Sequence, residues 1–353
     1  MTVGPRARKY LLSQRFNYKI FVPHVWLMKH KLLNFARQLA LMLLVIWTVV
    51  SLVTLLIELV PGDPATSILG ETSTFEQRAN FNHEHGLDRP VFFVSYSAED
   101  GFKWNGIENQ YVDYWVGVLH GDLGTSFQTD RPVVDMILER YPATIKLAVA
   151  SMIIAIGIAV PLGVLSGSRR NSLVDNLGSL VALLGISLPT FVIGPFLVYV
   201  FAVKLRVFSP IGSANPEDIV LPAITLGAAL SAILTRMIRS SVIEELGEDY
   251  VRTARAKGLS ERKVLLKHVL KNGLIPVVTI LGLQLGVLLA GAIITEKIFS
   301  WQGLGLLLLE DGIAKRDYRL IQGCVLVISV TYILANSLTD YVYRKLDPRI
   351  RLS

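Results

Sequence analysis

The sequence predicts an all-α polytopic membrane protein with six transmembrane helices, both termini in the cytoplasm, and an extracytoplasmic cap between the first two spans. Three observations support this fold class. The 353 residues are 52% hydrophobic and only 18% charged, outside the usual range of soluble domains. Six apolar runs are each long enough to cross about 30 Å of hydrocarbon. The loops between them alternate between basic and acidic or balanced composition, which sets the orientation by the positive-inside rule.

The chain begins with a basic segment, residues 1–38, which holds eight Lys/Arg and no Asp/Glu. Aromatic residues such as Phe16 and Trp26 are interleaved with the charges. This composition indicates a cytoplasmic segment lying on the anionic leaflet, with a solvated, disordered tail as the alternative. Because the net charge of +7 is concentrated beside apolar runs, it favours contact with the lipid bilayer and does not indicate a nucleic-acid partner.

The six predicted spans are 39–60, 144–166, 174–203, 219–240, 276–295 and 321–343. Four prolines fall inside or at the ends of three of these runs: Pro161, Pro189, Pro195 and Pro222. Membrane helices tolerate proline where neighbouring helices or cavity water satisfy the freed carbonyl. The prolines therefore predict bent helices around a pathway, and simple packing kinks are the alternative.

The loop at 61–143 contains thirteen Asp/Glu, five Lys/Arg and many aromatic residues. It is too long for a connector and predicts a small folded cap outside the membrane. Within it, residues 132–147 predict a surface helix that ends at Pro142 and leads into the second span. Residues 144–345 then form the core with the remaining five spans, and residues 346–353 form a cytoplasmic tail.

A basic segment at 241–275 lies between two apolar runs and is predicted to be cytoplasmic. Its main part, residues 244–276, is called the hook below. One helical arm places Val251 and Ala254 three residues apart, which gives a small, flat face. The second arm, beyond a break at Gly258, places Leu265, Leu266, Val269 and Leu270 on one face and Lys263, Lys267 and Lys271 on another. Glycine permits a sharp turn at the break. The hook is suited to receiving a protein partner, and a basic loop resting on lipid is the alternative.

Motifs for catalysis or nucleotide binding do not occur in the sequence. It has no G-x-x-x-x-G-K-[ST], no G-x-S-x-G and no H-E-x-x-H. His83 and His85 lack a third ligand at a suitable spacing, so no metal site is expected, and His268 is interpreted as an interfacial side chain rather than a base. The single cysteine, Cys324, lies within an apolar run. We therefore expect a chain that is not an enzyme and binds no cofactor itself.

Ionisable residues are almost absent deep in the spans, and Glu58, Lys146, Asp175, Glu296 and Asp340 all lie near the ends of the runs. A secondary carrier needs an intramembrane group to couple an ion gradient, so a stand-alone carrier is the less favoured alternative. A membrane enzyme or a non-transporting scaffold would need a catalytic constellation, which the sequence lacks. If the chain moves a solute uphill, the energy must come from a partner, and the hook is the predicted docking place.

These segments resemble one known family, the permease subunits of ABC importers of the oligopeptide/dipeptide type, and in particular their first permease subunit. The hook resembles the coupling ("EAA") loop of that family. The resemblance extends from residue 39 to the end and includes LVPGDPA (59–65), HGLDRPV (85–91), GDLGTSF (121–127), ERYPATIKLA (139–148), FSWQGLGLLLLEDGIAKRDYRLIQG (299–323) and LDPRIR (346–351).

The resemblance implies a bacterial inner-membrane protein that forms half of an alternating-access pathway for oligo- or dipeptides. It implies a second homologous permease as heterodimer partner, two cytoplasmic ATPase subunits that bind ATP and Mg, and an extracytoplasmic solute-binding protein. The residues implied to dock the ATPase are Asp249, Tyr250, Arg252, Thr253, Ala254, Arg255, Ala256, Lys257 and Gly258. Because similar permeases carry nickel, glycosides or other small solutes, these remain alternative substrates.

Overall fold

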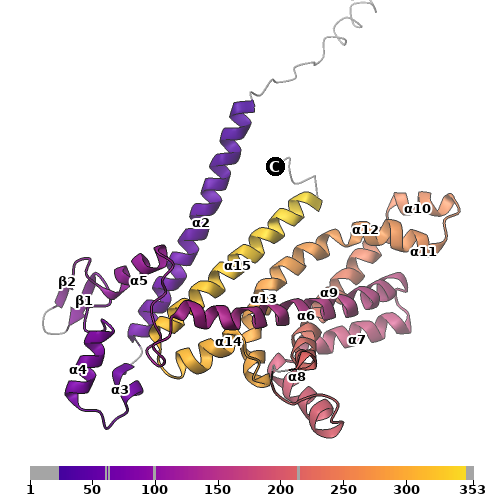
Figure 1. Ribbon diagram of the computed structural model, residues 1–353. Coiled ribbons are helices and arrows are strands. Elements are labelled where there is room, and N and C mark those ends of the chain that lie inside the picture. Colours follow the sequence, from indigo (N-terminus) through magenta and orange to yellow (C-terminus); the bar gives the residue numbers. More distant parts are fainter. Residues whose placement is uncertain (1–23, 60–61, 63, 98–100, 213–214, 347–353) are drawn as a thin grey trace, which may run out of the picture. The chain divides into compact units, whose positions relative to one another are not determined.

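The computed structural model describes residues 24–59, 62, 64–97, 101–212 and 215–346. It is predominantly helical, with one two-stranded sheet within the described residues (Figure 1). The chain forms two compact units, Met1–Thr48 and Val49–Ser353, and each is considered by itself. Residues 1–23 of the predicted basic segment and residues 347–353 of the predicted tail lie outside the described residues.

Four helices of the described part are long and apolar enough to cross a membrane: Ala36–Leu59, Val133–Ser168, Pro216–Leu246 and Tyr318–Val342. Three helix pairs pass the same test jointly but are bent, by 103°, 49° and 86°: Leu173–Ser187 with Thr190–Lys204, Glu261–Gly273 with Ile275–Gly286, and Ala292–Phe299 with Leu304–Ile313. The structure therefore has four to seven candidate spans. The helical, polytopic class is confirmed, whereas the predicted number of six depends on how the bent pairs cross.

The first unit contains the N-terminal part of α2 (His24–Leu59). Its side chains Leu41, Leu43 and Trp47 are about half exposed. An apolar helix surface of this kind is suited to lipid. The second unit begins with the last turns of α2, where Val50 and Thr54 are buried.

The segment between α2 and the next long helix is folded. Its elements are α3 (Pro64–Leu69), α4 (Phe75–Glu84), β1 (Val94–Ser97), β2 (Gly101–Trp104) and α5 (Gln110–Leu119). Thr74 and Gln77 form a capping box that fixes the start of α4, and the Asn109 side chain caps α5. The two strands pair antiparallel, with Val94 opposite Trp104. The all-α prediction is wrong for this hairpin, whose β-branched and aromatic residues favour strands.

Helix α6 (Val133–Ser168) is continuous and contains both Pro142 and Pro161. The predicted helix end at Pro142 is therefore wrong. Proline removes one helical hydrogen bond, but tertiary contacts hold the adjacent residues in place. The Trp301 indole N–H donates to the Ala143 carbonyl at 3.0 Å, and the Tyr141 and Thr331 hydroxyls lie 3.0 Å apart.

The core of the second unit is the contact between α6 and α9 (Val220–Leu246), the most extensive between any two described elements. Glycines allow the two backbones to approach closely. A Cβ atom at Gly163 would lie 2.7 Å from the Ile238 Cβ and 2.9 Å from the Thr235 carbonyl oxygen. Small residues at crossings are the usual means of packing membrane helices, because lipid provides no hydrophobic driving force between them.

We expect Gly163→Val to destabilise the protein by about 1–3 kcal/mol, because its side chain would overlap Ile238 and the α9 backbone. Gly157→Val in the same helix is the matched control, since a Cβ there meets nothing within 4 Å. Thermal unfolding of both variants in nanodiscs measures the difference. Equal unfolding temperatures for the two variants would contradict the packing argument.

The predicted span 174–203 is not one straight helix. It consists of α7 (Leu173–Ser187), α8 (Thr190–Leu197) and the π-helix η1 (Val198–Lys204), with a bend of 103° after α7. Leu188 is extended (φ −90°, ψ 119°) because the ring of Pro189 disfavours a helical residue before it.

The four prolines predicted to bend helices therefore have different positions. Pro189 lies at the sharp bend, and Pro195 lies inside α8 just before η1. Pro161 lies within the continuous helix α6. Pro222 follows η2 (Pro216–Ile219) in the first turn of α9, where proline disturbs no helical hydrogen bond.

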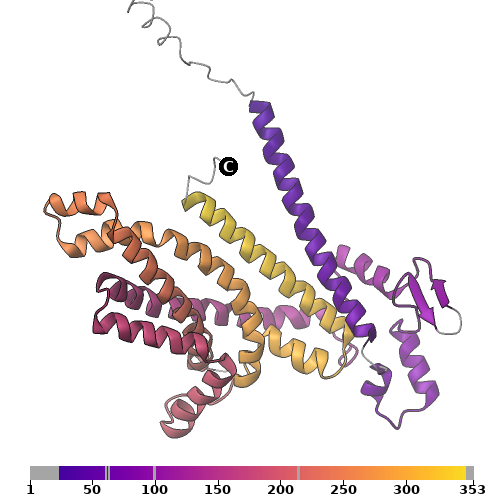
Figure 2. The ribbon, with the colours of Figure 1, turned by 180° about the vertical axis from the view of Figure 1, so that it is seen from behind.

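The C-terminal part consists of α13 (Ile275–Phe299), α14 (Leu304–Leu306), the π-helix η4 (Leu307–Ile313) and α15 (Tyr318–Leu346). Helices α13 and α15 run side by side (Figures 1 and 2). Gly286 and Gly282 allow this approach, since a Cβ at either position would overlap Tyr332 or Thr339. After α13 the chain turns by 86° into α14 and η4, through Ser300 in the left-handed region.

Candidate functional site

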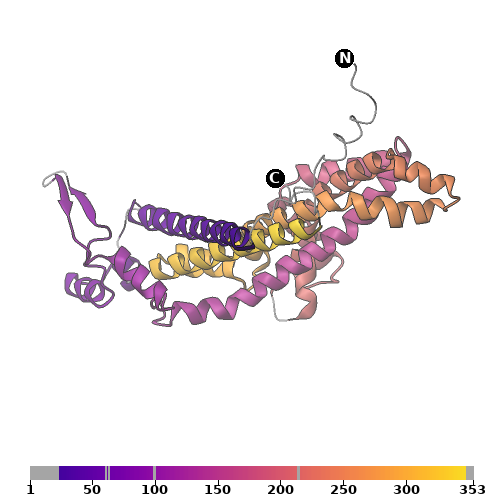
Figure 3. The ribbon, with the colours of Figure 1, turned by 90° about the horizontal axis from the view of Figure 1, so that it is seen from above.

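The hook leaves the end of α9 and folds into two helical arms (Figure 3). The first arm is α10 (Asp249–Ala256). The second arm runs without interruption through α11 (Glu261–Lys263), the π-helix η3 (Val264–Val269) and α12 (Leu270–Gly273). Gly258 separates the arms at φ +75°, a left-handed conformation that glycine adopts without strain. The break predicted at Gly258 is therefore confirmed.

One face of each arm packs against the chain itself. Val251, Ala254, Val264 and Val269 are buried and belong to the same core cluster as Leu234 and Ile238 of α9. Ala254 was expected to leave a shallow face for a partner, but it is only 6% exposed and faces its own chain. The correction follows from the return arm, which covers the small-residue face. Of the nine residues implied to dock the ATPase, Tyr250 is half-buried. The exposed ones are Asp249, Arg252, Thr253, Arg255, Ala256, Lys257 and Gly258.

The second arm also differs in detail from the prediction. Val264 and Val269, five residues apart, form its buried face, whereas Leu266 is half exposed. A π-helix brings residues five apart onto one side, so the apolar face predicted with α-helical spacing is wrong at Leu266. Lys263, Lys267 and Lys271 are exposed, as their spacing predicts.

Two contacts hold the arms in place. The Arg255 guanidinium donates two bonds to the Glu261 carboxylate, at 2.8 and 3.1 Å, across the elbow at Gly258. These bonds raise the pKa of Arg255, which therefore stays charged. The Tyr250 hydroxyl donates to Glu245 at the end of α9 and lies 3.5 Å from the His268 carbonyl oxygen. Burial, together with Glu245, raises the pKa of Tyr250 to about 12. The hook is thus fixed to α9 and presents a mainly basic outer face.

An ion pair that the sequence does not predict joins α7 to α9. Asp175, only 2% exposed, accepts bonds from Arg239 Nε at 2.5 Å and Nη2 at 2.8 Å. The Asp175 carboxylate also accepts the Asn171 backbone N–H at 2.9 Å. Asp175 had been identified only as a residue near the end of a span. Its partner lies 64 positions further on in a different helix, so sequence spacing carries no signal for the pair.

A second buried network surrounds Glu296 at the end of α13. The Thr144 hydroxyl donates to Glu296 Oε1 at 2.6 Å, and the Leu306 N–H donates to Oε2 at 3.0 Å. Thr144 in turn accepts the Leu304 N–H at 2.8 Å. A Cβ atom at Gly303 would lie 2.2 Å from the Glu296 carboxylate, which explains the glycine in this tight turn. The network holds the 86° turn between α13 and α14 against α6.

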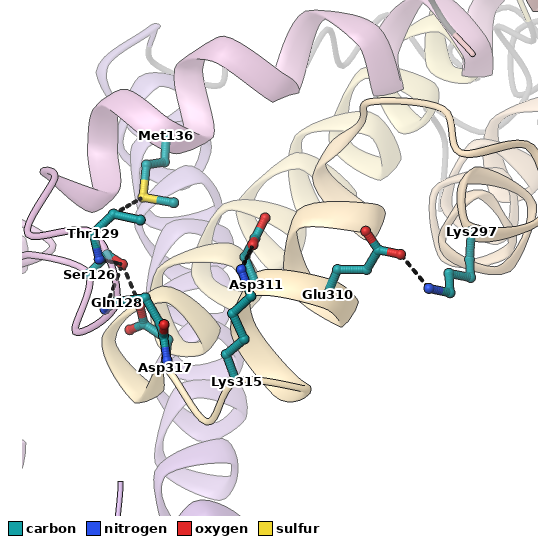
Figure 4. A network of polar contacts seen from close by, with 9 residues as sticks. All are labelled: Ser126, Gln128, Thr129, Met136, Lys297, Glu310, Asp311, Lys315 and Asp317. Carbon is teal, nitrogen blue, oxygen red and sulfur yellow. Dashed lines mark hydrogen bonds and ion pairs between the residues drawn. The ribbon is translucent and has the colours of Figure 1, made fainter. Parts of the chain in front are cut away.

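A third network connects the segment before α6 to the start of α15 (Figure 4). The Ser126 hydroxyl donates to the fully buried Asp317 carboxylate at 2.6 Å, and the Leu320 N–H donates to it at 3.1 Å. Burial raises the pKa of Asp317, and these hydrogen bonds partly oppose the rise. Nearby, Lys315 pairs with Asp311 at 2.6 Å, and Lys297 pairs with Glu310. These contacts place the loop at 121–131 over the end of the helical core.

No group of three or more His, Cys, Asp or Glu side chains within the described ranges is arranged to hold a metal ion. His83 lies 2.9 Å from Asp88, and His85 packs against Phe81 and Phe127. The two histidines thus have separate local partners.

The long apolar helices and the bent pairs are those of a polytopic membrane protein. Residues 159–352 match the family described as "Binding-protein-dependent transport system inner membrane component", and residues 32–148 match its N-terminal family. The chain belongs to this family of ABC-importer permeases, and it is accordingly a non-enzymatic, multi-pass protein of the bacterial inner membrane.

The chain is similar to curated relatives over most of its length. It is 41% identical over 300 residues to the glutathione transport system permease protein GsiC of Salmonella typhimurium, covering 85% of this chain and 92% of that protein. It is 39% identical to GsiC of Escherichia coli K12 over the same shares. Two inward-facing structures of the MetNI methionine ABC transporter share the fold, with TM-scores of 0.53 and 0.52 at 16% and 18% identity. They cover 60% and 61% of this chain and 96% and 97% of those chains.

Proposed function

We propose that this chain forms half of an alternating-access pathway in an ATP-driven importer of short peptides. The observation that carries the substrate class is the 41% identity, over 85% of the chain, to a permease named for glutathione transport. Glutathione is a tripeptide, so the relative and the predicted substrate class agree.

In the proposed complex, a second homologous permease completes the pathway. Two ATPase subunits bind ATP and Mg in the cytoplasm, and a solute-binding protein delivers the peptide from outside. With six spans and both termini in the cytoplasm, the hook would lie on the ATPase side. The cap at 61–143 and the loops at 204–218 and 296–320 then face the solute-binding protein.

The packing of the hook against α9 and α6 supports this coupling role. Val251 and Val264 of its two arms lie in the same core cluster as Leu230 and Ile238 of α9 and Leu147 of α6. A close-packed interior transmits displacement rather than absorbing it. Closure of the ATPase pair would therefore move α9 and α6 with the hook, which supplies the rigid link between two discrete arrangements. The exposed residues from Arg252 to Gly258 would make the contact.

The test is reconstitution of the complete importer in proteoliposomes with its solute-binding protein. We expect ATP-dependent accumulation of labelled glutathione or triglycine, and no accumulation when the ATPase subunits are omitted. Nickel and a glycoside serve as competing substrates in the same assay. Uptake of either one in preference to every peptide tested would contradict the proposed substrate class. Ion-driven uptake by the chain alone would contradict the proposed mechanism.

A further inference from the structure

A polar cavity of about 310 Å³ lies where the end of α2 meets the segment before α6 and the start of α15. Its wall includes Thr54 and Glu58 of α2, Asn82 of α4, Arg89, and Arg319 and Gln322 of α15. The volume is at the lower end of the range for small-molecule sites and corresponds to about ten water molecules. All of these residues belong to the second compact unit. The cavity lies apart from the hook and from the networks around Asp175 and Glu296, and it borders the third network through Phe127 and Tyr318.

Hydrogen bonds between the wall residues keep the cavity in shape. Gln322 Nε2 donates to Thr54 Oγ1 at 2.9 Å, which joins α15 to α2. Arg89 donates to Asp113 at 2.8 Å, and Gln110 donates to the Arg89 carbonyl at 2.7 Å. The arrangement of these side chains is therefore set before any ligand enters, which lowers the ordering cost of binding.

Three groups on the wall have unused hydrogen-bonding capacity within the described residues. The half-buried Arg319 donates no hydrogen bond there and makes no ion pair, although its guanidinium lies 5.9 Å from the Tyr114 ring centroid and the Asp113 and Asp122 carboxylates act on it electrostatically. Glu58 likewise has no ion pair among these residues. The Asn82 Oδ1 atom is buried without a donor. A partly buried cation and a buried amide oxygen without partners are costly, so such groups are usually matched by a ligand or by water.

Arg319, Glu58 and Asn82 together present a cation, an anion and an amide oxygen to a solute in the cavity. A guanidinium presents a planar fork of N–H donors that fits a carboxylate. The Glu58 carboxylate fits an ammonium group, and Asn82 Oδ1 can accept an amide N–H. We propose that this cavity binds a short zwitterionic peptide, with its carboxylate on Arg319 and its ammonium group near Glu58. This inference rests on the proposed function for the choice of a peptide, and it adds a peptide site on the permease itself.

The site is tested on the full chain in phosphatidylcholine nanodiscs, without ATPase subunits or solute-binding protein, by equilibrium binding of labelled triglycine. We expect triglycine amide and N-acetyltriglycine each to bind about tenfold more weakly than triglycine, because each lacks one terminal charge. These two ligands probe the wild-type chain, so this part of the test does not depend on any variant folding.

Variants of the chain test which residue binds each end of the peptide. Arg319→Gln is expected to weaken triglycine binding about tenfold and to abolish the preference for triglycine over its amide, and Arg319→Lys to restore part of the loss. Glu58→Gln is expected to abolish the preference over N-acetyltriglycine. Arg131→Gln is the matched control, because Arg131 is an exposed arginine outside the cavity that pairs with Glu139 at 2.6 Å. It should bind triglycine as the wild type does.

Several results would overturn the site. They are undetectable triglycine binding by the wild-type chain, equal binding of triglycine and its amide, or equal losses for Arg319→Gln and Arg131→Gln. Displacement of triglycine by glycerophosphoethanolamine at lower concentration than by unlabelled triglycine would instead assign the cavity to a lipid headgroup. Peptide uptake by the complete importer, with no binding to the isolated chain, would remove the site and leave the proposed function standing. Peptide binding to the isolated chain, with no uptake by the complete importer, would support the site and contradict the proposed function.

Discussion

Gly258→Asp is expected to abolish peptide uptake while leaving the chain folded and inserted in the membrane. A Cβ atom at Gly258 meets nothing within 4 Å, so the side chain has space. The backbone there, at φ +75°, costs a non-glycine residue roughly 1–2 kcal/mol. The added carboxylate would lie next to Lys257 and near Arg255 in sequence, at the tip of the predicted ATPase contact, and would lower the positive charge there. Uptake and ATP hydrolysis in proteoliposomes measure the result, and we expect hydrolysis to persist without uptake.

Gly258→Asn is the matched control for the elbow. Asparagine has the same shape as aspartate, tolerates the left-handed conformation better than most residues, and carries no charge. If the charge prevents docking, the Asn variant should retain most of the uptake that the Asp variant loses. Equal loss in both variants would attribute the defect to backbone strain, and wild-type uptake by Gly258→Asp would refute the docking role of the elbow.

Arg239→Ala is expected to destabilise the protein by about 1–3 kcal/mol, because it leaves the Asp175 carboxylate with the Asn171 N–H but without its charged partner. Thermal unfolding in nanodiscs measures the loss. Asp175→Asn combined with Arg239→Ala should recover a large part of it, since no buried charge is then left unpaired.

Arg236→Ala is the matched control for this ion pair. Arg236 lies one turn earlier in α9, is exposed, and makes no ion pair with any residue that the structure describes. Its substitution should change the unfolding temperature little. A double variant no more stable than Arg239→Ala alone would show that lost packing, not the unpaired carboxylate, causes the effect.

The sequence predicted correctly those structural features that depend on residues close together in the chain. The apolar runs predicted long helices because length and hydropathy alone decide whether a segment can cross a bilayer. Gly258 marked the elbow of the hook because only glycine adopts φ +75° without strain. Pro189, one of the four prolines from which bent helices were predicted, lies at the bend after α7, because its ring disfavours a helical conformation at Leu188. The strands at 94–97 and 101–104 were too short to stand out from the surrounding loop.

The orientation and pairing of individual side chains depend on tertiary contacts. Hydropathy, charge and glycine act over a few residues, so they suffice to predict a helical membrane protein with a basic, two-armed hook. Only the tertiary structure showed that Ala254 faces inward, since the return arm through η3 covers it. Likewise, only the structure paired Asp175 with Arg239 and placed the unpaired Arg319 in a cavity with Glu58. These residues are far apart in the chain, and the energy of a buried charge depends on which distant group the fold brings beside it.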